Sequence, residues 1–395
     1  MLNSYKSIFQ IRGSYRVSIS GFIARFPMAM DSIAIIYFVQ SIEKSYFIAG
    51  ALAATAALTS TVSIPLWAKA ADKMGQRRVI VTAIPLRALA FLVFIYLVHS
   101  GYPKWSWFLC IFIAESASLS IGSMSRRRWV HMLNQENKSA LSTAFALESL
   151  LDELIFIAGP IITTLVVSVI DPMAGIVSAL FFLVLGGLLL ATHKHSEPKV
   201  VTEDASDSDK SVFKSKSLQA IALPLTLAGG SFSAINICVV AFTDERGIKQ
   251  ISGLLLGLWA LGGAISALIN GAIHWKISHG KRFILYLFGM TLVAFTFPFM
   301  HNVWSLGCTL FIQGMCIAPL LPNGLPMVTE SIHESRLTQA ITLTTAGIPL
   351  TGALGSFIAG RIIDSYGAST GLWLPFIFLS GSCLTTALYL KQYKI

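Results

Sequence analysis

Seven ionisable residues lie inside hydrophobic segments of the first half of the chain, each segment long enough to cross a bilayer. They are two arginines and five acids: Arg25, Arg87, Asp31, Glu115, Glu148, Asp152 and Glu153. The corresponding segments after residue 217 contain no Lys, Arg, Asp or Glu in their interiors. A charge at the bilayer centre costs about 2.5–3.5 kcal/mol on insertion scales, and such residues usually serve function. We therefore expect the ion chemistry of this protein in its first half.

The spacing of these residues predicts one ion pair between helices. Arg25 and Asp31 are six residues apart, so they lie well round one helix from each other and need partners on other helices. Glu148 and Asp152 are four residues apart and share a helical face, whereas Glu153 points elsewhere. The two segments cross in the same direction and place Arg25 at the depth of Glu148 and Asp152. We infer that Arg25 bridges to one of these two acids.

The remaining acids are candidates for proton or substrate chemistry. Five acids face two arginines, so three acids have no obvious cationic partner. An unpaired carboxylic acid in an apolar environment is readily protonated, and it can pass a proton on when its access to water changes. Asp31 and Glu115 are the main candidates for proton coupling. They could instead bind a cationic substrate or belong to a fixed structural network, and for Arg25, Glu148 and Asp152 a structural or gating role is equally open.

The composition shows which elements must position these residues. Of the residues, 54% are hydrophobic and 12% are charged, and the mean hydropathy is +0.70. A helix that crosses the hydrocarbon core needs about 20 mostly apolar residues. Twelve segments approach this length: 17–39, 47–67, 79–98, 105–124, 140–166, 173–192, 218–241, 250–274, 283–300, 303–324, 340–360 and 371–390. We predict an all-α integral membrane fold with twelve transmembrane helices in two six-helix bundles.

The net charge of +10 comes from the loops on one side of these segments. That side carries most of the 29 Lys and Arg residues, whereas the opposite loops carry only Lys44, Lys104, Arg246 and Lys249. By the positive-inside rule, both termini are expected in the cytoplasm of a multi-pass protein of the cell membrane. The basic charge is thus explained by topology, and no nucleic-acid partner is expected. Residues 1–16 are polar and basic and do not resemble a cleavable signal peptide.

A polar segment divides the chain into two similar halves. Residues 193–217 are charged and without periodicity, as expected of a cytoplasmic linker between bundles at 1–192 and 218–395. Ile48-Ala49-Gly50 matches Ile251-Ser252-Gly253 at an offset of 203 residues. Parallel six-helix repeats organise one large class of transporters. The halves therefore predict a transporter architecture.

The loop after the second segment reads Ala68-Lys69-Ala70-Ala71-Asp72-Lys73-Met74-Gly75-Gln76-Arg77-Arg78. It resembles the signature of the major facilitator superfamily, Gly-x-x-x-Asp-x-x-Gly-Arg/Lys-x-Arg/Lys. It departs from the signature at Ala68 and at Gln76. Asp72 ends a helix, Gly75 permits a tight turn, and the basic side chains can pair with Asp72 and with helix C-terminal carbonyls. We expect a cytoplasmic gating latch here. The second half has Trp275 at the position of the acid, so we expect the latch in the first half only.

Three further stretches are Ser125-Arg126-Arg127-Arg128-Trp129, the stretch from Ala146 to Leu154, and Gly159-Pro160, which resembles an antiporter motif. Together they are similar to actinobacterial-type drug or multidrug exporters of that superfamily. The resemblance implies a cavity that opens alternately to either side of the membrane, lined by the first and fourth segments.

The second half contains prolines and glycines that bend helices or allow close packing, whereas the first half contains the buried charges. Pro319, Pro322, Pro326 and Pro349 interrupt the tenth and eleventh segments, as expected of bending helices that line a cavity. The glycines of the eighth segment favour close helix crossing. The candidate cavity residues are Phe232, Asn236, Trp259 and Gln313.

These features predict a secondary active transporter that exports a small amphipathic or drug-like molecule, coupled to protons. No Walker, HExxH or GxSxG motif is present, so ATP hydrolysis and enzymatic catalysis are not expected. The five cysteines form no CxxC pair, and neither a metal nor a cofactor is expected. The expected partners are the substrate, protons and the lipid bilayer, with the protein a monomer. Uptake or facilitated diffusion of a nutrient such as a sugar is the main alternative, and a membrane enzyme or receptor is a remote one.

Overall fold

The computed structural model describes residues 8–11, 13–133, 138–198, 216–273, 275–317, 319–329 and 344–389. Every regular element in these ranges is a helix. Contacts divide the chain into two compact units. The first unit comprises Met1–Phe38 and Thr59–Ala205, and the second comprises Val39–Leu58 and Ser206–Ile395. The second unit therefore includes the connection between the first two predicted transmembrane segments.

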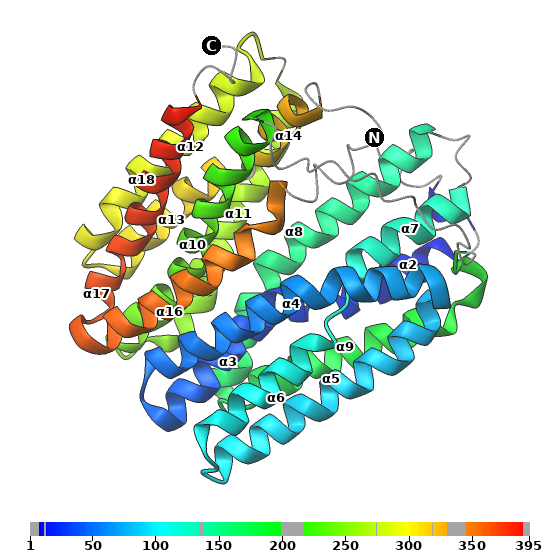
Figure 1. Cartoon of the computed structure of the whole chain (residues 1–395), viewed down its shortest axis with the longest axis horizontal. Coiled ribbons are helices and arrows are strands. Elements are labelled where there is room, and N and C mark those ends of the chain that lie inside the picture. The colour runs from blue at the N-terminus through cyan, green and yellow to red at the C-terminus, as the bar shows by residue number, and fades with distance from the viewer. Residues whose placement is uncertain are drawn as a thin grey trace. The chain divides into compact units, whose positions relative to one another are not determined.

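The first unit is built from the helices coloured blue to green in Figure 1. They are α2 (Ser14–Ala24), α3 (Pro27–Glu43), α4 (Tyr46–Met74), α5 (Gln76–His99), α6 (Lys104–Ser116), α7 (Ile121–Leu133), α8 (Lys138–Val169), α9 (Ala174–Thr192) and the short η1 (Lys194–Ser196). Helices α3 and α4 continue into the second unit. Within the first unit, α2 packs on α9, and α5 packs on α6 and α9. This packing surrounds the charged residues with apolar side chains.

Two transmembrane segments of the first unit are broken near their charged residues. The first breaks at Arg25 and Phe26, because the residue before Pro27 disfavours helical geometry and proline lacks an N–H. The fourth breaks between α6 and α7, just after Glu115. Side chains of α4 bond to carbonyls at this second break: Ser63 Oγ donates to the carbonyl of Glu115 at 2.7 Å, and Trp67 Nε1 donates to that of Ser116 at 2.7 Å. The second break is thus stabilised in a hydrophobic setting, where unpaired backbone groups are costly.

The second unit is built from the helices coloured green to red in Figure 1. They are α10 (Lys216–Asp244), η3 (Lys249–Ile251), α11 (Ser252–Ala272), α12 (His279–Thr296), η4 (Phe297–Phe299), α13 (Val303–Ile317), α14 (Leu320–Thr329), α16 (Ile348–Tyr366), α17 (Ala368–Gly371) and α18 (Trp373–Leu388). Helix α10 packs on α16 and α18, and α11 packs on α13. The α11–α13 crossing is close because Gly262 lies against the backbone of Phe311, and Gly314 lies against the carbonyl of Trp259.

The predicted all-α membrane fold is confirmed. In the described residues, eleven helices or helix pairs are long and apolar enough to cross a membrane, and the shorter apolar helix α13 occupies the position of the tenth predicted segment. That segment is interrupted: α13 ends at Ile317, and α14 begins at Leu320, directly after Pro319. Residues 340–343 of the eleventh predicted segment lie outside the described residues, as does most of the predicted linker 193–217.

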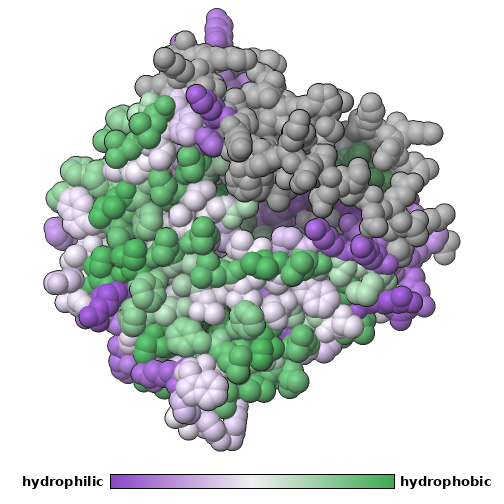
Figure 2. Space-filling view, viewed as in Figure 1, coloured by the Kyte–Doolittle hydropathy of each residue, from purple (hydrophilic) through white to green (hydrophobic). Residues whose placement is uncertain are grey.

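Large apolar side chains cover the outer faces of these helices. Figure 2 shows hydrophobic residues spread over much of one face. Leu89, Leu165, Leu268 and Leu354 are all exposed, although a soluble protein would bury many such side chains. A surface of this kind suits contact with lipid chains.

Candidate functional site

Arg87 binds both of the acids that the sequence analysis assigns to proton coupling. Its Nη2 atom lies 2.5 Å from Asp31 Oδ2 and 2.9 Å from Glu115 Oε1. Its Nη1 atom donates to Ser118 Oγ at 2.5 Å, and Ser118 in turn donates to the other carboxylate oxygen of Glu115. Three helices, α3, α5 and α6, therefore meet at one cation. We call Asp31, Arg87 and Glu115 the Arg87 cluster.

The expectation that three acids lack a cationic partner was wrong. Two acids share Arg87, two others share Arg25, and in the described residues only Glu153 of the five has no ion pair. A count of charges assumes one cation for each acid, whereas a guanidinium has five N–H donors and can serve two carboxylates. Glu153 is half-buried and lies outside both groups.

The Arg87 cluster carries one more negative than positive charge when both acids are ionised. Its side chains are largely shielded: exposed fractions are 16% for Asp31, 10% for Arg87 and 6% for Glu115. Arg87 Nε is buried with no hydrogen-bond partner among the described residues. An unbalanced charge in a setting of low dielectric is expensive, so one bound proton or one bound cation would neutralise the cluster.

Arg25 forms the second charged group of the first unit, and the inferred bridge is present. Its Nη2 atom lies 2.6 Å from Glu148 Oε2, and its Nη1 atom lies 2.6 Å from Asp152 Oδ1. Arg25 thus binds both acids where the sequence analysis required only one. Its Nε atom donates to the carbonyl of Gly21 at 2.9 Å, which fixes the side chain along α2.

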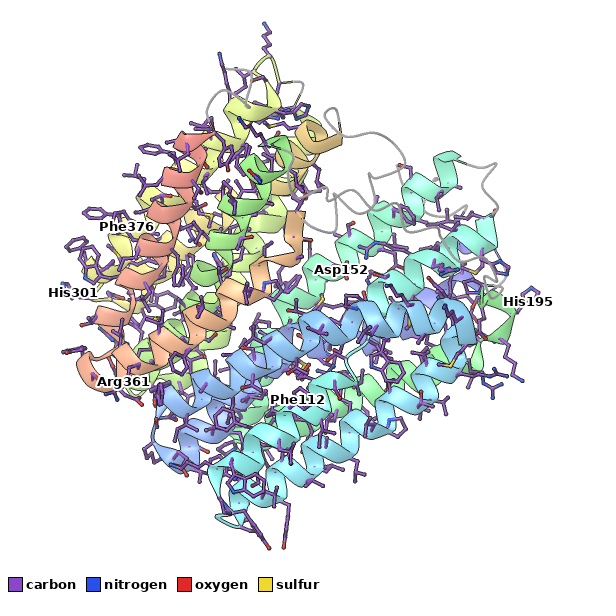
Figure 3. The ribbon with its side chains drawn as sticks, in the orientation of Figure 1. Phe112, Asp152, His195, His301, Arg361 and Phe376 are labelled. Carbon is purple, nitrogen blue, oxygen red and sulfur yellow. The ribbon has the colours of Figure 1, made fainter. Side chains whose placement is uncertain are left out.

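Two further side chains complete the Arg25 group and were missed from the sequence. Arg126 Nη2 lies 2.7 Å from Asp152 Oδ2, and Trp129 Nε1 donates to Glu148 Oε1 at 2.8 Å. Both come from α7, which extends beyond residue 124, the predicted end of the fourth segment. With two arginines and two acids, this group is neutral without a proton. Figure 3 labels Asp152 among the helices of this unit.

The latch motif makes an ion pair within its own unit. Asp72, at the end of α4, pairs with Arg127 on α7. Gly75 has a φ of 92°, a conformation that residues with a side chain rarely adopt, so the predicted tight turn is present. The backbone N–H of Arg77 donates to Glu197 Oε1 at 2.8 Å. Ala68, Lys73 and Arg78 lie with exposed side chains around this turn.

Gln76, one of the two departures from the family signature, is buried and matched to Arg128. Arg128 Nε donates to Gln76 Oε1 at 2.8 Å, and Gln76 Nε2 donates to the carbonyl of Met124 at 3.2 Å. Arg128 Nη1 also bonds to three acceptors at the end of α9, which are the carbonyl of Leu190 at 2.9 Å, the carbonyl of His193 at 3.1 Å and Ser196 Oγ at 3.0 Å. A basic residue at position 76 would place two cations together, whereas glutamine accepts the bond.

The second unit has no acid at the corresponding turn. Arg282 Nη2 lies 2.9 Å from His279 Nδ1, and its guanidinium lies 5.5 Å from the centre of the Trp275 ring. Trp275 Nε1 donates to the carbonyl of Asn270 at 3.2 Å. A histidine and an aromatic ring therefore contact the arginine here, where the first unit has a carboxylate.

Three of the four candidate cavity residues lie together in the second unit. The rings of Phe232 and Trp259 are 6.1 Å apart, and Trp259 Nε1 donates to Gln313 Oε1 at 2.5 Å. Gln313 Nε2 is buried without a hydrogen-bond partner among the described residues. The side chain of Asn236 donates to the carbonyl of Phe232 on its own helix at 3.2 Å. The glycine crossing of α11 and α13 brings Trp259 and Gln313 within reach of each other.

Two acids of the second unit bind the ends of α3 and α4 that lie opposite the basic loops. Asp364, on α16, accepts hydrogen bonds from Ser45 Oγ at 2.6 Å and from the backbone N–H groups of Tyr46 at 2.7 Å and Phe47 at 3.0 Å. This carboxylate caps the N-terminus of α4, where negative charge is favourable.

Asp244, at the end of α10, makes the second set of bonds. It accepts from Gln40 Nε2 at 2.7 Å and from Tyr46 Oη at 2.6 Å, and it lies 2.8 Å from Lys249 Nζ. Lys249 also donates to Gln40 Oε1 at 2.9 Å. We call these side chains, together with Asp364, the far-side network. No local sequence pattern indicated it, because its partners, apart from Asp244 and Lys249, lie about 200 to 320 positions apart in the chain.

Solved structures share this fold over almost their whole length. The nucleoside transporter NupG superposes with a TM-score of 0.73 and 13% identity, covering 97% of this chain and 100% of that one. A bacterial homologue of the iron transporter ferroportin, in an inward-facing state, has a TM-score of 0.74 and 15% identity, covering 97% and 99%. At this identity the likeness concerns the fold alone.

Curated proteins match over shorter stretches. The multi-drug resistance efflux pump PmrA of Streptococcus pneumoniae is 22% identical over 171 residues, which is 42% of this chain and 43% of that protein. The 4-hydroxybenzoate transporter PcaK of Pseudomonas aeruginosa is 24% identical over 160 residues, or 39% and 34%. The chain thus matches less than half the length of these relatives.

The family model of the Major Facilitator Superfamily covers nearly the whole chain. It matches residues 17–311 and 274–394, which include the latch motif, both charged groups and the far-side network. The fold, the signature turn and this match agree, and the chain belongs to the Major Facilitator Superfamily of transporters.

Proposed function

We propose that this transporter exports a small amphipathic or drug-like molecule in exchange for protons, with the Arg87 cluster as the proton site. The observation that carries the proposal is that two shielded acids, Asp31 and Glu115, share one guanidinium. The similarity to an efflux pump supports export as the direction of transport. The broken fourth segment supports the Arg87 cluster as the place of the proton site, because transporters bind coupling ions where helices are interrupted.

The charge balance explains how the cluster could hold a proton. With both acids ionised, the net charge is negative, and one proton on either acid makes the cluster neutral. Arg87 then remains paired with the other acid, so protonation does not leave a cation without a partner. The Arg25 group is neutral already, and we assign it a structural role in the proposal.

The substrate would be recognised in part by the aromatic residues of the second unit. Phe232 and Trp259 offer flat apolar surface, and the buried Gln313 Nε2 offers an N–H donor group with no partner among the described residues. A flat molecule with a hydrogen-bond acceptor fits this chemistry. Uptake of an aromatic nutrient is the second candidate function, favoured by the similarity to a 4-hydroxybenzoate transporter.

Flux into proteoliposomes tests the function directly. The purified protein would be reconstituted, and a panel of amphipathic cations, aromatic acids, nucleosides and sugars would be offered with and without a pH gradient. Proton movement driven by a drug-like compound supports export. Gradient-independent movement of an aromatic acid or a sugar would favour the nutrient alternative, and no flux of any compound would contradict the substrate classes proposed here.

The latch is proposed to control conformational exchange, and this gives a first prediction. Asp72→Asn should slow transport severalfold while expression and thermal stability stay nearly unchanged. The reason is that Asp72 is 48% exposed, and exposed ion pairs contribute only about 0–1 kcal/mol to stability. Initial rates in proteoliposomes and melting curves of the same preparations measure the two effects.

The partner of Asp72 supplies the control. Arg127→Gln should produce the same defect, and exchanging the two charges, Asp72→Arg with Arg127→Asp, should restore part of the rate. Trp275→Ala, at the equivalent turn of the second unit, should not slow transport. Normal turnover by well-expressed Asp72→Asn protein would contradict the proposed role of the latch.

The far-side network is proposed to hold the start of α4 against α10 and α16 within the second unit, on the side opposite the basic loops, which we place outside the cell. Asp364→Ala removes three hydrogen bonds from the start of α4. Loss of a helix cap costs about 1 kcal/mol, so the population in which the start of α4 is released should rise by roughly fivefold. Labelling of Ala54→Cys, a buried position on α4, by a membrane-impermeant maleimide in a cysteine-free background measures this release.

An acid outside the network provides the comparison. Asp171 lies in a loop on the same side, and among the described residues its carboxylate bonds only within its own turn, to the N–H of Met173 at 2.9 Å. Asp171→Ala should leave the labelling rate unchanged. Equal labelling of the Asp364→Ala and Asp171→Ala proteins would show that the network does not hold the start of α4 in place.

A further inference from the structure

A pocket of about 630 Å³ lies at the basic end of the first unit. It is formed where the chain enters α2 and where it leaves α9. The side chains that matter here are Tyr15 and Arg16 on α2 and His193, Lys194 and His195 beyond α9. Figure 3 shows His195 at this end of the unit. The transport mechanism proposed above uses none of these residues.

The charge of this pocket is positive. Arg16 and Lys194 are basic, and none of the described residues that line the pocket is acidic. Burial, and then the charges of Arg16 and Arg128, lower the pKa of His193. His193 thus lies in a positive potential and is neutral at pH 7. An anion entering the pocket would meet this potential without a competing carboxylate.

The wall of the pocket is held in place by buried bonds. Arg128 bonds to the carbonyls of Leu190 and His193 and to Ser196 Oγ, which fixes the turn η1. On the other wall, Arg16 Nε donates to Tyr15 Oη at 3.0 Å. The turn that carries Lys194 and His195 is therefore positioned before any ligand arrives, which lowers the entropy lost on binding.

A second basic pocket adjoins the same turn. Its volume is about 820 Å³, and Lys194 lines it together with Arg77 and Arg78. Its acid, Glu197, already accepts the N–H of Arg77 at 2.8 Å. Lys194 therefore lies between two basic pockets, which extends the positive surface at this end of the helices.

Exposed apolar side chains continue from the pocket along the two helices. Ile19, one turn beyond Arg16 on α2, is 54% exposed, and Leu189, one turn before Thr192 on α9, is 39% exposed. Tyr15 is also exposed and lies at the helix end, where aromatic residues favour the membrane interface. The pocket thus combines a cationic recess with an apolar surface next to it.

We propose that this pocket binds the phosphate headgroup of an anionic phospholipid, with Arg16 and Lys194 as its ligands and the acyl chains lying along the exposed faces of α2 and α9. Basic pockets between transmembrane helices at the membrane surface have the chemistry to bind such headgroups. The apolar surface beside the pocket favours a lipid over a free phosphate ester, which would use only the cationic part.

Lipid titrations of the full-length protein test the site. Purified protein in a zwitterionic detergent is titrated with phosphatidylglycerol, phosphatidylcholine or soluble glycerol phosphate, and bound molecules are counted by native mass spectrometry. Phosphatidylglycerol should bind in preference to the other two. Arg16→Gln with Lys194→Gln should weaken its binding by about 30-fold, because each basic residue at an anionic surface contributes about a fivefold change.

The matched control removes the same charge elsewhere. Lys276→Gln with Lys281→Gln lowers the net charge equally at two exposed lysines of the second unit and should leave binding unchanged. An equal loss in both double variants would show a general attraction to basic surface and overturn the site. Equal binding of phosphatidylcholine would overturn the role of charge, and equal binding of glycerol phosphate would replace the lipid by a soluble anion.

Discussion

Removing one of the two acids that share Arg87 is expected to uncouple transport from the proton gradient. In Glu115→Gln, the cluster retains Asp31 and Arg87, which neutralise each other without a proton. Binding of a proton is then no longer needed to neutralise the site. Accumulation driven by a pH gradient should fall to background, whereas counterflow, which needs only binding and conformational exchange, should continue. Asp31→Asn should give the same pair of results, measured in parallel proteoliposomes.

The charge balance also predicts a rescue. Glu115→Gln combined with Arg87→Gln leaves Asp31 as a single acid with no cation beside it, and this acid again needs one proton to be neutral. Gradient-driven accumulation should return in the double variant if the protein is expressed at a level near that of Glu115→Gln. A structural role for Arg87 predicts the opposite, because a second loss from the same network would add to the first.

Glu153 supplies the matched control for this experiment. It is an acid of a transmembrane helix, it is half-buried, and it has no ion pair among the described residues. Glu153→Gln should therefore leave both accumulation and counterflow intact. Accumulation that persists in both Asp31→Asn and Glu115→Gln would refute coupling through the Arg87 cluster, and loss in Glu153→Gln alone would move the proton site to that residue.

The largest loss of stability is expected from Arg25→Ala. Glu148 is completely buried and would lose its only cationic partner among the described residues. Breaking a buried ion pair by removing one partner costs about 3–5 kcal/mol, because the other charge stays buried without compensation. Thermal melting of the purified protein, together with its expression level, measures this loss. Removing the stranded charge as well, with Arg25→Gln and Glu148→Gln, should recover much of it.

A double-mutant cycle separates the two acids that Arg25 binds. Asp152 is 22% exposed and keeps Arg126 at 2.7 Å, so it tolerates the loss of Arg25. Glu148 has no such alternative. The coupling energy of Arg25 with Glu148 should therefore exceed that of Arg25 with Asp152. Equal coupling, or none for either acid, would contradict the structural role assigned to this group.

Several features follow from the sequence because they depend on local spacing or on depth in the membrane. The transmembrane segments follow from the length of the apolar runs, whatever their neighbours are. The Arg25 bridge was predictable because Glu148 and Asp152 are four residues apart on one helix face and lie at the depth of Arg25. The turn at Gly75 follows from the freedom of glycine to adopt a positive φ.

Other features depend on how helices approach one another, which local patterns do not record. Arg87 could be assigned to Asp31 and Glu115 only once α3, α5 and α6 were seen to meet beside the break in the fourth segment. Asp364 caps a helix that begins about 320 residues before it, so the sequence gives no hint of the bond. The length and apolar character of the segments determined that they cross the membrane. The tertiary packing of the helices decided which charges neutralise one another, because the partner of a charge is set by distance in space and a guanidinium can bind two acids at once.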